Sequence, residues 1–565
     1  MFIQNTFIFF VSFYLLLVSV LGYGLLFQTI SFGSIRNLNS QKSIYIGFYG
    51  LFLITLISLI TSLLVPHNFI HNILLHFLGI LFFIFLKAEN KNQFLKIIFL
   101  ISFFIISALL ISKTHDDFPY YHLPFTRYLT EHKVIFGIGN LQHGFKLISS
   151  LFFLNSTFYL PFIKYFSFHF PLIFFLIFFN YFLIKEIIHK ENHEVSKLLY
   201  LFAFIFFNLS FNRLGEFGTD KAGHLLITIL IIKTFQITCL NNNKNSLDNF
   251  MFLIPLLAFC ISLKTYFIPY ILLGLTIFLL DTKFMKSLKI ILTSKVFVIF
   301  LLTLSVYFFH HFISTGCLIS PISITCFGDS LNWASGSKHF EGLSTWLEQW
   351  AKAGAGPNFR VEDPLMYIKN FNWISRWFDY YFTGKVLDQL LILISSYLVI
   401  LFLFKRFIVK NINSVLDKKI IFFYSIILVI FLIWFTKHPT LRYGGYPIVF
   451  LTFSIPIALL YQKIQDKNFF EKRLKFLVLL VIVIFNFKNL NRIGDEFQRS
   501  DYYKFDNFPF FAIPDKKYYS EKTLSGLTIH KTEGYCWNTP SPCTMNIEKF
   551  GFKVEKKYGF YFFIR

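Results

Sequence analysis

Two adjacent carboxylates, Asp116 and Asp117, stand where a hydrophobic run ends, and Tyr120 and His122 follow them closely. Neighbouring carboxylates repel each other, and this repulsion raises the pKa of one of them. A carboxylate in that state serves well as a general base, and an acidic pair can also hold a divalent metal. Because the pair has no evident structural purpose at the end of an apolar run, it predicts a reactive site. The alternative is an ordinary solvated loop.

Three further polar clusters also flank apolar runs and combine carboxylates with cations. Their members are Arg213, Glu216, Asp220, Lys221 and His224; Lys264 and Tyr266; and Lys437, His438, Arg442 and Tyr443. Lys and Arg suit a phosphate or pyrophosphate leaving group. We expect these clusters to meet the acidic pair in one cavity, as a lipid-phosphate-dependent transferase would require. Each cluster alone could instead be a solvated loop, and each histidine an interfacial residue rather than a metal ligand.

The composition places the chain among polytopic helical membrane proteins. Hydrophobic residues make up 55% of the 565 residues and charged residues only 15%, below the roughly 25% typical of soluble domains. Lys and Arg outnumber Asp and Glu by 53 to 30, which gives a formal charge of +23. Most of these cations lie in short loops between apolar runs, the positive-inside pattern of membrane proteins. The charge therefore does not indicate a nucleic-acid partner.

Apolar runs of helical length predict an all-α polytopic membrane protein with about fourteen transmembrane helices. Their expected ranges are 7–30, 44–65, 69–86, 96–112, 165–184, 198–211, 223–240, 250–263, 267–280, 290–312, 387–404, 420–435, 446–461 and 473–487. The first run lacks a basic segment before it, so it predicts a retained helix rather than a signal peptide. Residues 250–280 could alternatively form a re-entrant pair.

The distribution of Lys and Arg among the loops also predicts sidedness. It assigns the loops 113–160 and 313–385 and the C-terminal segment 488–565 to the extracytoplasmic side. Residues 1–487 would then form the transmembrane domain. Residues 488–565 would form a small mixed extracytoplasmic domain with a few strands.

Four of the six cysteines form two close pairs in segments assigned to the outside. Cys317 and Cys326 lie nine residues apart, and Cys536 and Cys543 seven apart. This pattern predicts two local disulfides in an oxidising compartment, with four free thiols as the alternative. The spacings do not suit a zinc site, where two to four residues usually separate the ligands.

The loop 313–385 holds five of the seven tryptophans: Trp333, Trp346, Trp350, Trp373 and Trp377. Its middle has helix-like apolar spacing followed by a glycine-rich breaker. One interpretation is an interfacial amphipathic helix anchored by its indoles at headgroup depth. The other is a surface on which sugar rings stack, because aromatic rings pack against the apolar faces of pyranoses.

Three stretches resemble the GT-C superfamily of polyprenyl-phosphate-sugar glycosyltransferases. HDDFPYYH resembles the acidic first-loop motif, GEFGTDKAGH the further acidic site, and LRYGGYP the arginine-bearing late loop. The chain is also similar to uncharacterised bacterial multispanning membrane proteins that carry DD-x-x-YYHLP. The family's acidic loop normally follows the first helix, whereas four predicted helices precede it here. This departure implies an N-terminal addition of three helices or an accidental match.

The resemblance implies transfer of a sugar from a polyprenyl-phosphate carrier to a glycan, lipid or protein hydroxyl, on the outer, periplasmic face of a bacterial inner membrane. Asp116 would act as the base with Asp117 in support, while Arg442 and Lys264 would steady the leaving phosphate. The expected substrate contacts are Tyr120, His122, Arg213, Glu216, Asp220, Lys264, His438, Arg442 and Tyr443. A divalent metal, Mg²⁺ or Mn²⁺, on Asp116, Asp117 and Asp220 is compatible with this chemistry but not required by it.

Two rival functions remain open from the sequence. A transporter or flippase of lipid-linked glycans would carry charges buried in mid-helix and internal repeats, and the sequence shows neither clearly. An O-antigen polymerase or ligase would also use outside Arg and His residues but would not need the acidic pair.

Overall fold

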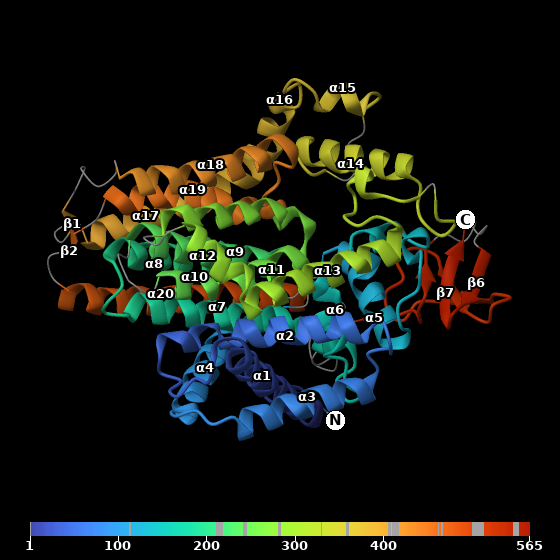
Figure 1. Cartoon of the computed structure of the whole chain (residues 1–565), viewed down its shortest axis with the longest axis horizontal. Helices are drawn as coiled ribbons and strands as arrows, with labels where there is room; N and C mark the ends of the chain where they lie inside the picture. Colours follow the sequence, from blue (N-terminus) through green and yellow to red (C-terminus); the bar gives the residue numbers. More distant parts are fainter. Residues whose placement is uncertain are drawn as a thin grey trace.

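The structure is a computed structural model of the chain. It describes residues 2–111, 115–210, 219–240, 246–280, 284–328, 330–356, 361–404, 408–409, 417–460, 463–464, 467–499, 513–545 and 553–564. Long helices run side by side along the longest axis of the molecule (Figure 1). The short pair β1 (Ile408–Val409) and β2 (Lys463–Ile464) lies at one end, and the C-terminal strands lie at the other.

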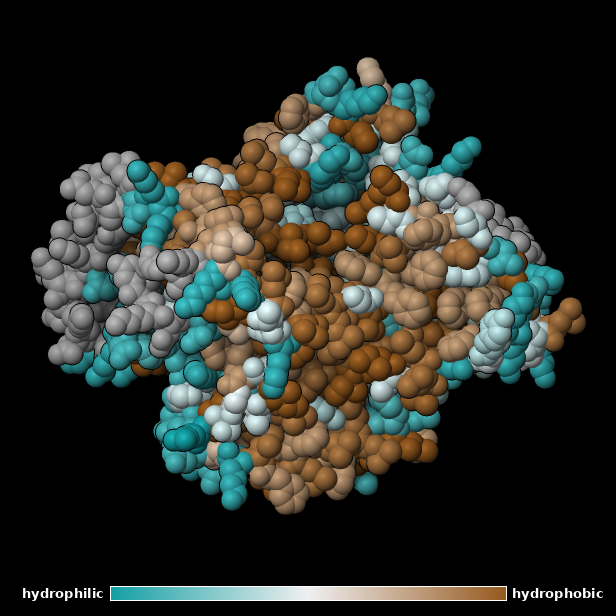
Figure 2. All heavy atoms as spheres, viewed as in Figure 1, coloured by the Kyte–Doolittle hydropathy of each residue, from teal (hydrophilic) through white to brown (hydrophobic). Residues whose placement is uncertain are grey.

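Eleven helical segments in the described part of the chain are long and apolar enough to cross a membrane. They are Gln4–Phe32, Gln41–Thr61, Lys91–Leu110, Tyr165–Ile188, Thr219–Leu240, Ser246–Leu263, Lys295–Thr315, Ile374–Leu403, Lys418–Lys437, Leu441–Leu460 and Lys472–Gln498. Hydrophobic residues cover much of the middle of the face shown in Figure 2. The protein is therefore a multi-pass membrane protein, as predicted.

Eleven of the fourteen predicted ranges overlap these segments, and the other three overlap described helices shorter than 18 residues. They are α3 (Phe69–Phe85), α8 (Glu194–Ser210) and the 3-10 helix η8 (Thr265–Leu279). The last helix, α20 (Lys467–Arg499), continues past the predicted limit at 487. An ion pair one helical turn apart, Arg492 with Glu496, supports this polar extension.

The first three helices form a closely packed unit: α1 (Phe2–Phe32), α2 (Ile46–Thr61) and α3. A Cβ atom on Gly22 would lie 1.8 Å from the carbonyl oxygen of Gly79, and one on Gly50 would lie 1.9 Å from that of Val20. Only glycine allows the helices to approach so closely, as at other small-residue helix interfaces in membranes.

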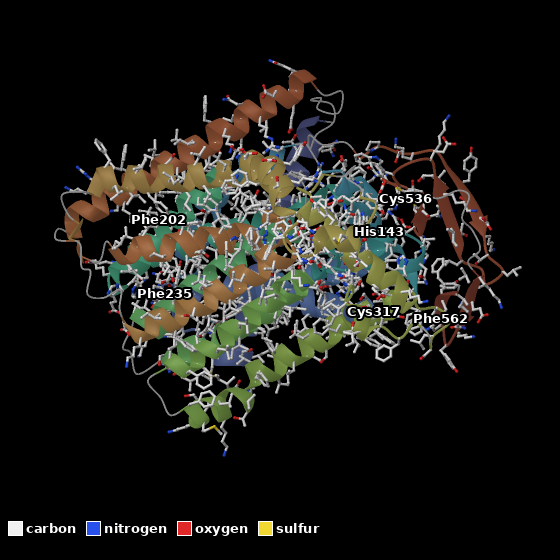
Figure 3. The ribbon with its side chains drawn as sticks, turned by 90° about the horizontal axis from the view of Figure 1, so that it is seen from above. His143, Phe202, Phe235, Cys317, Cys536 and Phe562 are labelled. Atoms are coloured by element: carbon white, nitrogen blue, oxygen red, sulfur yellow. A yellow bond between two sulfur atoms is a disulfide. The ribbon has the colours of Figure 1, made fainter. Side chains whose placement is uncertain are left out.

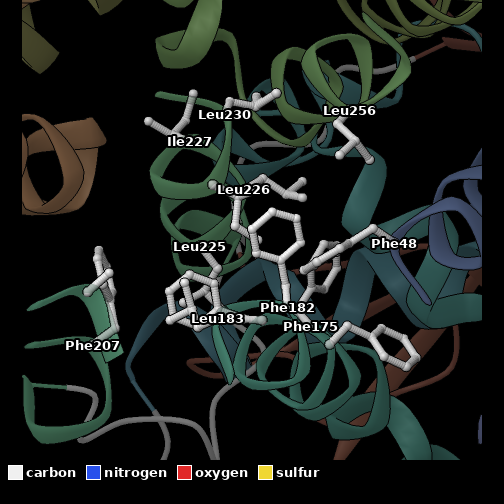
Figure 4. Packing of buried hydrophobic residues seen from close by; sticks show 14 of the residues in the cluster. Phe48, Phe175, Phe182, Leu183, Phe207, Leu225, Leu226, Ile227, Leu230 and Leu256 are labelled. Atoms are coloured by element: carbon white, nitrogen blue, oxygen red, sulfur yellow. The ribbon is translucent and has the colours of Figure 1, made fainter. Parts of the chain in front are cut away.

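The core of the bundle is built from phenylalanine and aliphatic side chains. The helices α7 (Phe170–Ile188), α8 and α9 (Thr219–Phe235) bury almost every side chain. Figure 4 shows Phe175, Phe182, Leu225 and Leu226 packed together in this core. The abundance of Phe thus fills the space between central helices as well as facing lipid.

One buried ion pair crosses this core. Lys233 donates to Glu186 at 2.9 Å, and Asn192 also donates to Glu186. Lys233 stands 13 positions after Asp220 on α9, about 20 Å along the helix. Lys233 lies in the last turn of α9 and Glu186 near the C-terminal end of α7, so the pair joins helix ends and does not occupy the mid-helix positions expected of a transporter.

The C-terminal segment carries short strands, as expected. The strands β3 (Tyr518–Lys522), β4 (Thr528–Thr532) and β5 (Cys543–Thr544) form one sheet, with β3–β4 antiparallel and β4–β5 parallel. The strands β6 (Lys553–Lys557) and β7 (Phe560–Ile564) form an antiparallel hairpin. Two disulfides are present, Cys317–Cys326 and Cys536–Cys543, so the predicted pairing is confirmed.

Candidate functional site

Four of the predicted charged residues meet in one ionic network at the ends of different helices. Arg442 Nη2 donates to Asp117 Oδ2 at 2.9 Å, and Arg442 Nε donates to Asp220 Oδ2 at 3.0 Å. Lys264 Nζ donates to the other oxygen of Asp220 and, at 3.2 Å, to the hydroxyl of Thr219. The charges of these two cations and two carboxylates balance. We call Asp117, Asp220, Lys264 and Arg442 the ionic network.

Helix termini position three members of this network. Asp220 lies in the first turn of α9, where the helix dipole favours a negative charge. Lys264 has an extended backbone and separates α11 (Ile254–Leu263) from η8. Asp117 immediately precedes the π-helical turn η3 (Phe118–His122). The network therefore joins the ends of elements that are far apart in sequence.

Arg442 lies in η12 (Leu441–Gly445), where the helical backbone is interrupted and Gly444 has a positive φ of 84°. Hydrogen bonds fix the loop before it: Trp377 Nε1 donates to the Pro439 carbonyl at 2.6 Å, and Trp434 Nε1 donates to the Thr440 carbonyl at 2.8 Å. Since buried indole N–H groups need acceptors, these bonds lock the loop and hold Arg442 at the network.

The ionic network borders a cavity of about 860 Å³. The residues that line it are His115, Asp116, Asp117, Tyr120, Tyr121, His143, Gly144, Leu147, Lys264, Tyr266, Lys338, His339, Gly342, Leu343, Trp346, Leu347, Trp350, Ala355, Arg442, Tyr443 and Tyr535. His143 lies between the two disulfides in the view of Figure 3. The volume is that of a typical small-molecule site.

The two members of the acidic pair have different surroundings. Asp117 is partly buried and paired with Arg442, whereas Asp116 is exposed, lines the cavity and has no ion pair among the described residues. Burial alone would raise the pKa of the Asp117 carboxyl. The His115 side chain and the charge of Arg442 outweigh burial and hold this pKa well below its usual range. The pKa of Asp117 is therefore lowered, whereas repulsion between the two neighbouring carboxylates was expected to raise the pKa of one of them.

Several predicted substrate contacts lie behind the cavity wall. Asp220 is behind Arg442, and His122 is buried. Burial lowers the pKa of His122 to about 3. His438 packs against Tyr266, with ring centroids 5.0 Å apart, and does not line the cavity. Arg213 and Glu216 lie outside the described residues.

The donor set does not suit a divalent metal. No three His, Cys, Asp or Glu side chains come together for one within the described ranges. The oxygens of Asp117 and Asp220 that would ligate a metal accept from Arg442 and Lys264 instead. The suggested metal set of Asp116, Asp117 and Asp220 is thus not assembled here.

Sequence reasoning missed two contributors to the cavity wall. One is α14 (Ser337–Lys352), whose indoles Trp346 and Trp350 line the cavity, while Trp333, Trp373 and Trp377 are buried. The spacing of apolar residues predicted this helix but not what it packs against. The other is Tyr535, beside the disulfide Cys536–Cys543, whose ring lies 6.0 Å from that of Tyr120.

Comparison with known proteins gives one family. Residues 7–450 match the model described as a domain of unknown function, DUF8201. The chain belongs to the DUF8201 family. No curated protein and no solved structure matches it. The DUF8201 match includes the whole ionic network and α14 but ends before α20 and the C-terminal strands, so Tyr535 lies outside it.

Proposed function

We propose that the protein is a membrane glycosyltransferase of GT-C type, which moves a sugar from a polyprenyl-phosphate carrier to a hydroxyl on a glycan, lipid or protein. One observation carries the proposal: an exposed carboxylate, Asp116, and two cations, Lys264 and Arg442, line the same cavity at the ends of membrane helices. A carboxylate that can accept a proton and two cations that can bind a phosphate, all on one cavity, support this proposal.

The proposed reaction uses these groups in separate roles. Asp116 accepts the proton of the acceptor hydroxyl as its oxygen attacks the anomeric carbon of the donor sugar. The bond between that carbon and the phosphate oxygen breaks, and the phosphate departs with the electron pair. Arg442 and Lys264 stabilise this negative charge. A guanidinium has five N–H donors, and among the described residues Arg442 uses one of them for Asp117 and one for Asp220, so a phosphate can be bound by the other donors.

The polyprenyl chain would stay in the bilayer while its phosphate reaches the network at the helix ends. This supports an active site at one face of the membrane. From the distribution of basic loops, we propose the outer, periplasmic face of a bacterial inner membrane.

The proposal is tested with the purified protein in liposomes that contain undecaprenyl phosphate carrying a radiolabelled hexose. We expect release of free undecaprenyl phosphate that depends on Asp116 and on an added hydroxyl acceptor from the cell envelope. Glu341→Gln is the matched control, because Glu341 is exposed and does not line the cavity. Release that persists in Asp116→Asn, or no release across a panel of hexose donors, would overturn the proposal.

A further inference from the structure

One face of α14 forms a wall of the cavity over three helical turns. Six of its residues that line the cavity recur at the spacing of a single helix face: His339, Gly342, Leu343, Trp346, Leu347 and Trp350. Glu341 does not line the cavity and is exposed. The helix therefore borders the cavity along its length and not only at one end.

Contacts along α14 define the two ends of this wall. At one end, the ring of Trp350 lies 5.8 Å from that of Tyr443, the neighbour of Arg442 in the ionic network. In the middle, the ring of Trp346 packs edge-to-face against that of His143, with the ring centroids 5.7 Å apart. At the other end, His339 contacts Lys146. Eleven positions separate His339 from Trp350, about 16 Å along the axis, which is longer than a single hexose ring.

The chemistry of the wall suits sugar rings placed one after another. Trp346 and Trp350 offer flat apolar faces one helical turn apart. Gly342 leaves open space where a larger residue would block the groove, since nothing lies within 4 Å of a Cβ added there. Lys338, His339 and Asp116 supply polar groups for hydroxyls.

A polyprenyl chain fits this groove less well. Its far end carries the polar residues Lys338 and His339, which offer nothing to a hydrocarbon. The groove is bordered by α14, which is not one of the eleven helices apolar enough to cross a membrane. A hydrocarbon chain would gain more by remaining in the bilayer.

We propose that the groove along α14 binds a glycan of several sugar units. The reacting unit lies by Trp350 and Arg442, and the following units pass Trp346 and Gly342 towards His339. This inference rests on the proposed function and names the substrate class of the same site, an oligosaccharide rather than a monosaccharide.

The experiment measures binding as well as transfer. Envelope polysaccharide from the source cells is cleaved by mild acid, and its fragments are separated by length from a single sugar upwards. Each fraction is titrated against the protein in nanodiscs, with tryptophan fluorescence as the readout. We expect affinity to rise with length and then level off, and Trp346→Ala to weaken binding of long fragments about fivefold with little effect on single sugars.

Gly342→Leu blocks the groove while favouring the helix, and we expect it to remove the dependence on length. Glu341→Leu adds the same side chain next to it, outside the cavity, and should leave the dependence unchanged. Affinity that does not vary with length, or an unaltered profile in Gly342→Leu, would overturn the inference. The proposed function would survive that result if transfer to short acceptors continued. Length-dependent binding without transfer by the wild type would instead remove the proposed function and leave a glycan-binding groove.

Discussion

Arg442 Nε lies 3.0 Å from Asp220 Oδ2, although 222 residues separate them in the chain. The contact joins η12 to the first turn of α9, and His224 on the same helix donates to the Arg442 carbonyl at 3.0 Å. Arg442 is therefore held through both its side chain and its backbone. Arg442 also reaches Asp117, so it links the acidic motif to the helix bundle.

Arg442→Ala should destabilise the protein as well as impair phosphate binding. It leaves Asp117 and Asp220, whose side chains are 22% and 10% exposed, without their shared cation, and breaking such a pair costs on the order of 3–5 kcal/mol. Adding Asp220→Asn should recover part of the loss. Thermal unfolding in detergent, measured for both single variants and the double variant, gives the coupling energy between Arg442 and Asp220. Strictly additive losses would contradict the network.

Asp116→Asn should reduce transfer by on the order of 10²–10⁴-fold, as expected when a general base is lost. It should leave the unfolding temperature nearly unchanged, because Asp116 is exposed and has no ion pair among the described residues. Asp117→Asn should act differently: it removes a partner of Arg442 and should lower both stability and donor use. Initial rates at varied donor concentration separate the two effects. Equal losses of stability in Asp116→Asn and Asp117→Asn would argue against a catalytic role for Asp116 and a structural role for Asp117.

Local sequence patterns predicted the helices because length and apolar content are properties of each segment. Even the short η8 coincides with a predicted range. The shared location of Asp117, Asp220, Lys264 and Arg442 followed from the alternation of basic and neutral loops, which places their helix ends on one side. The pairing of Arg442 with both acids did not follow, because it depends on how η12 packs against α9.

The missed features are all tertiary. The position of Trp346 and Trp350 depends on contacts between α14 and the loop that carries His143. Tyr535 reaches the cavity because the connection between β4 and β5, on which it lies, is attached to the acidic segment by backbone and side-chain hydrogen bonds. The sequence does not indicate that Lys233 and Glu186, 47 residues apart, would meet in the core.

Removing the disulfide Cys536–Cys543 should loosen the acidic segment as well as the connection between β4 and β5. Beside it, Trp537 N–H donates to the Pro119 carbonyl, and Ser541 N–H donates to Glu131 at 2.7 Å. A disulfide that closes a short loop stabilises the local folded structure by about 2–3 kcal/mol. We expect Cys536→Ser with Cys543→Ser to speed hydrogen exchange over residues 118–131. Cys239→Ser is the control, because that thiol is free. Unchanged exchange would show that the connection between β4 and β5 does not support the site.

Single cysteines test the predicted sidedness. Lys190 is exposed in the loop between α7 and α8, and Leu524 is fully exposed in the turn between β3 and β4. In intact cells, a cysteine at Leu524 should react with an impermeant thiol reagent, and one at Lys190 should react only after lysis. Labelling of both positions, or of Lys190 alone, in intact cells would refute the periplasmic location of the site.

Stability should fall in acid because histidines beside the cavity are held neutral. Burial, and then the charge of Lys146, lowers the pKa of His143 to about 4, and burial with nearby lysines does the same at His438. Between about pH 6.5 and 4 the unfolded chain binds protons at these positions that the folded chain does not, so the contribution of these two histidines lowers stability as pH falls through this window and does not change with pH above it. His143→Phe keeps an aromatic ring against Trp346 but cannot titrate. Its unfolding temperature, followed by fluorescence in detergent, should therefore depend less steeply on pH than that of the wild type. Identical slopes for the two proteins would show that His143 is not protonated preferentially in the unfolded chain.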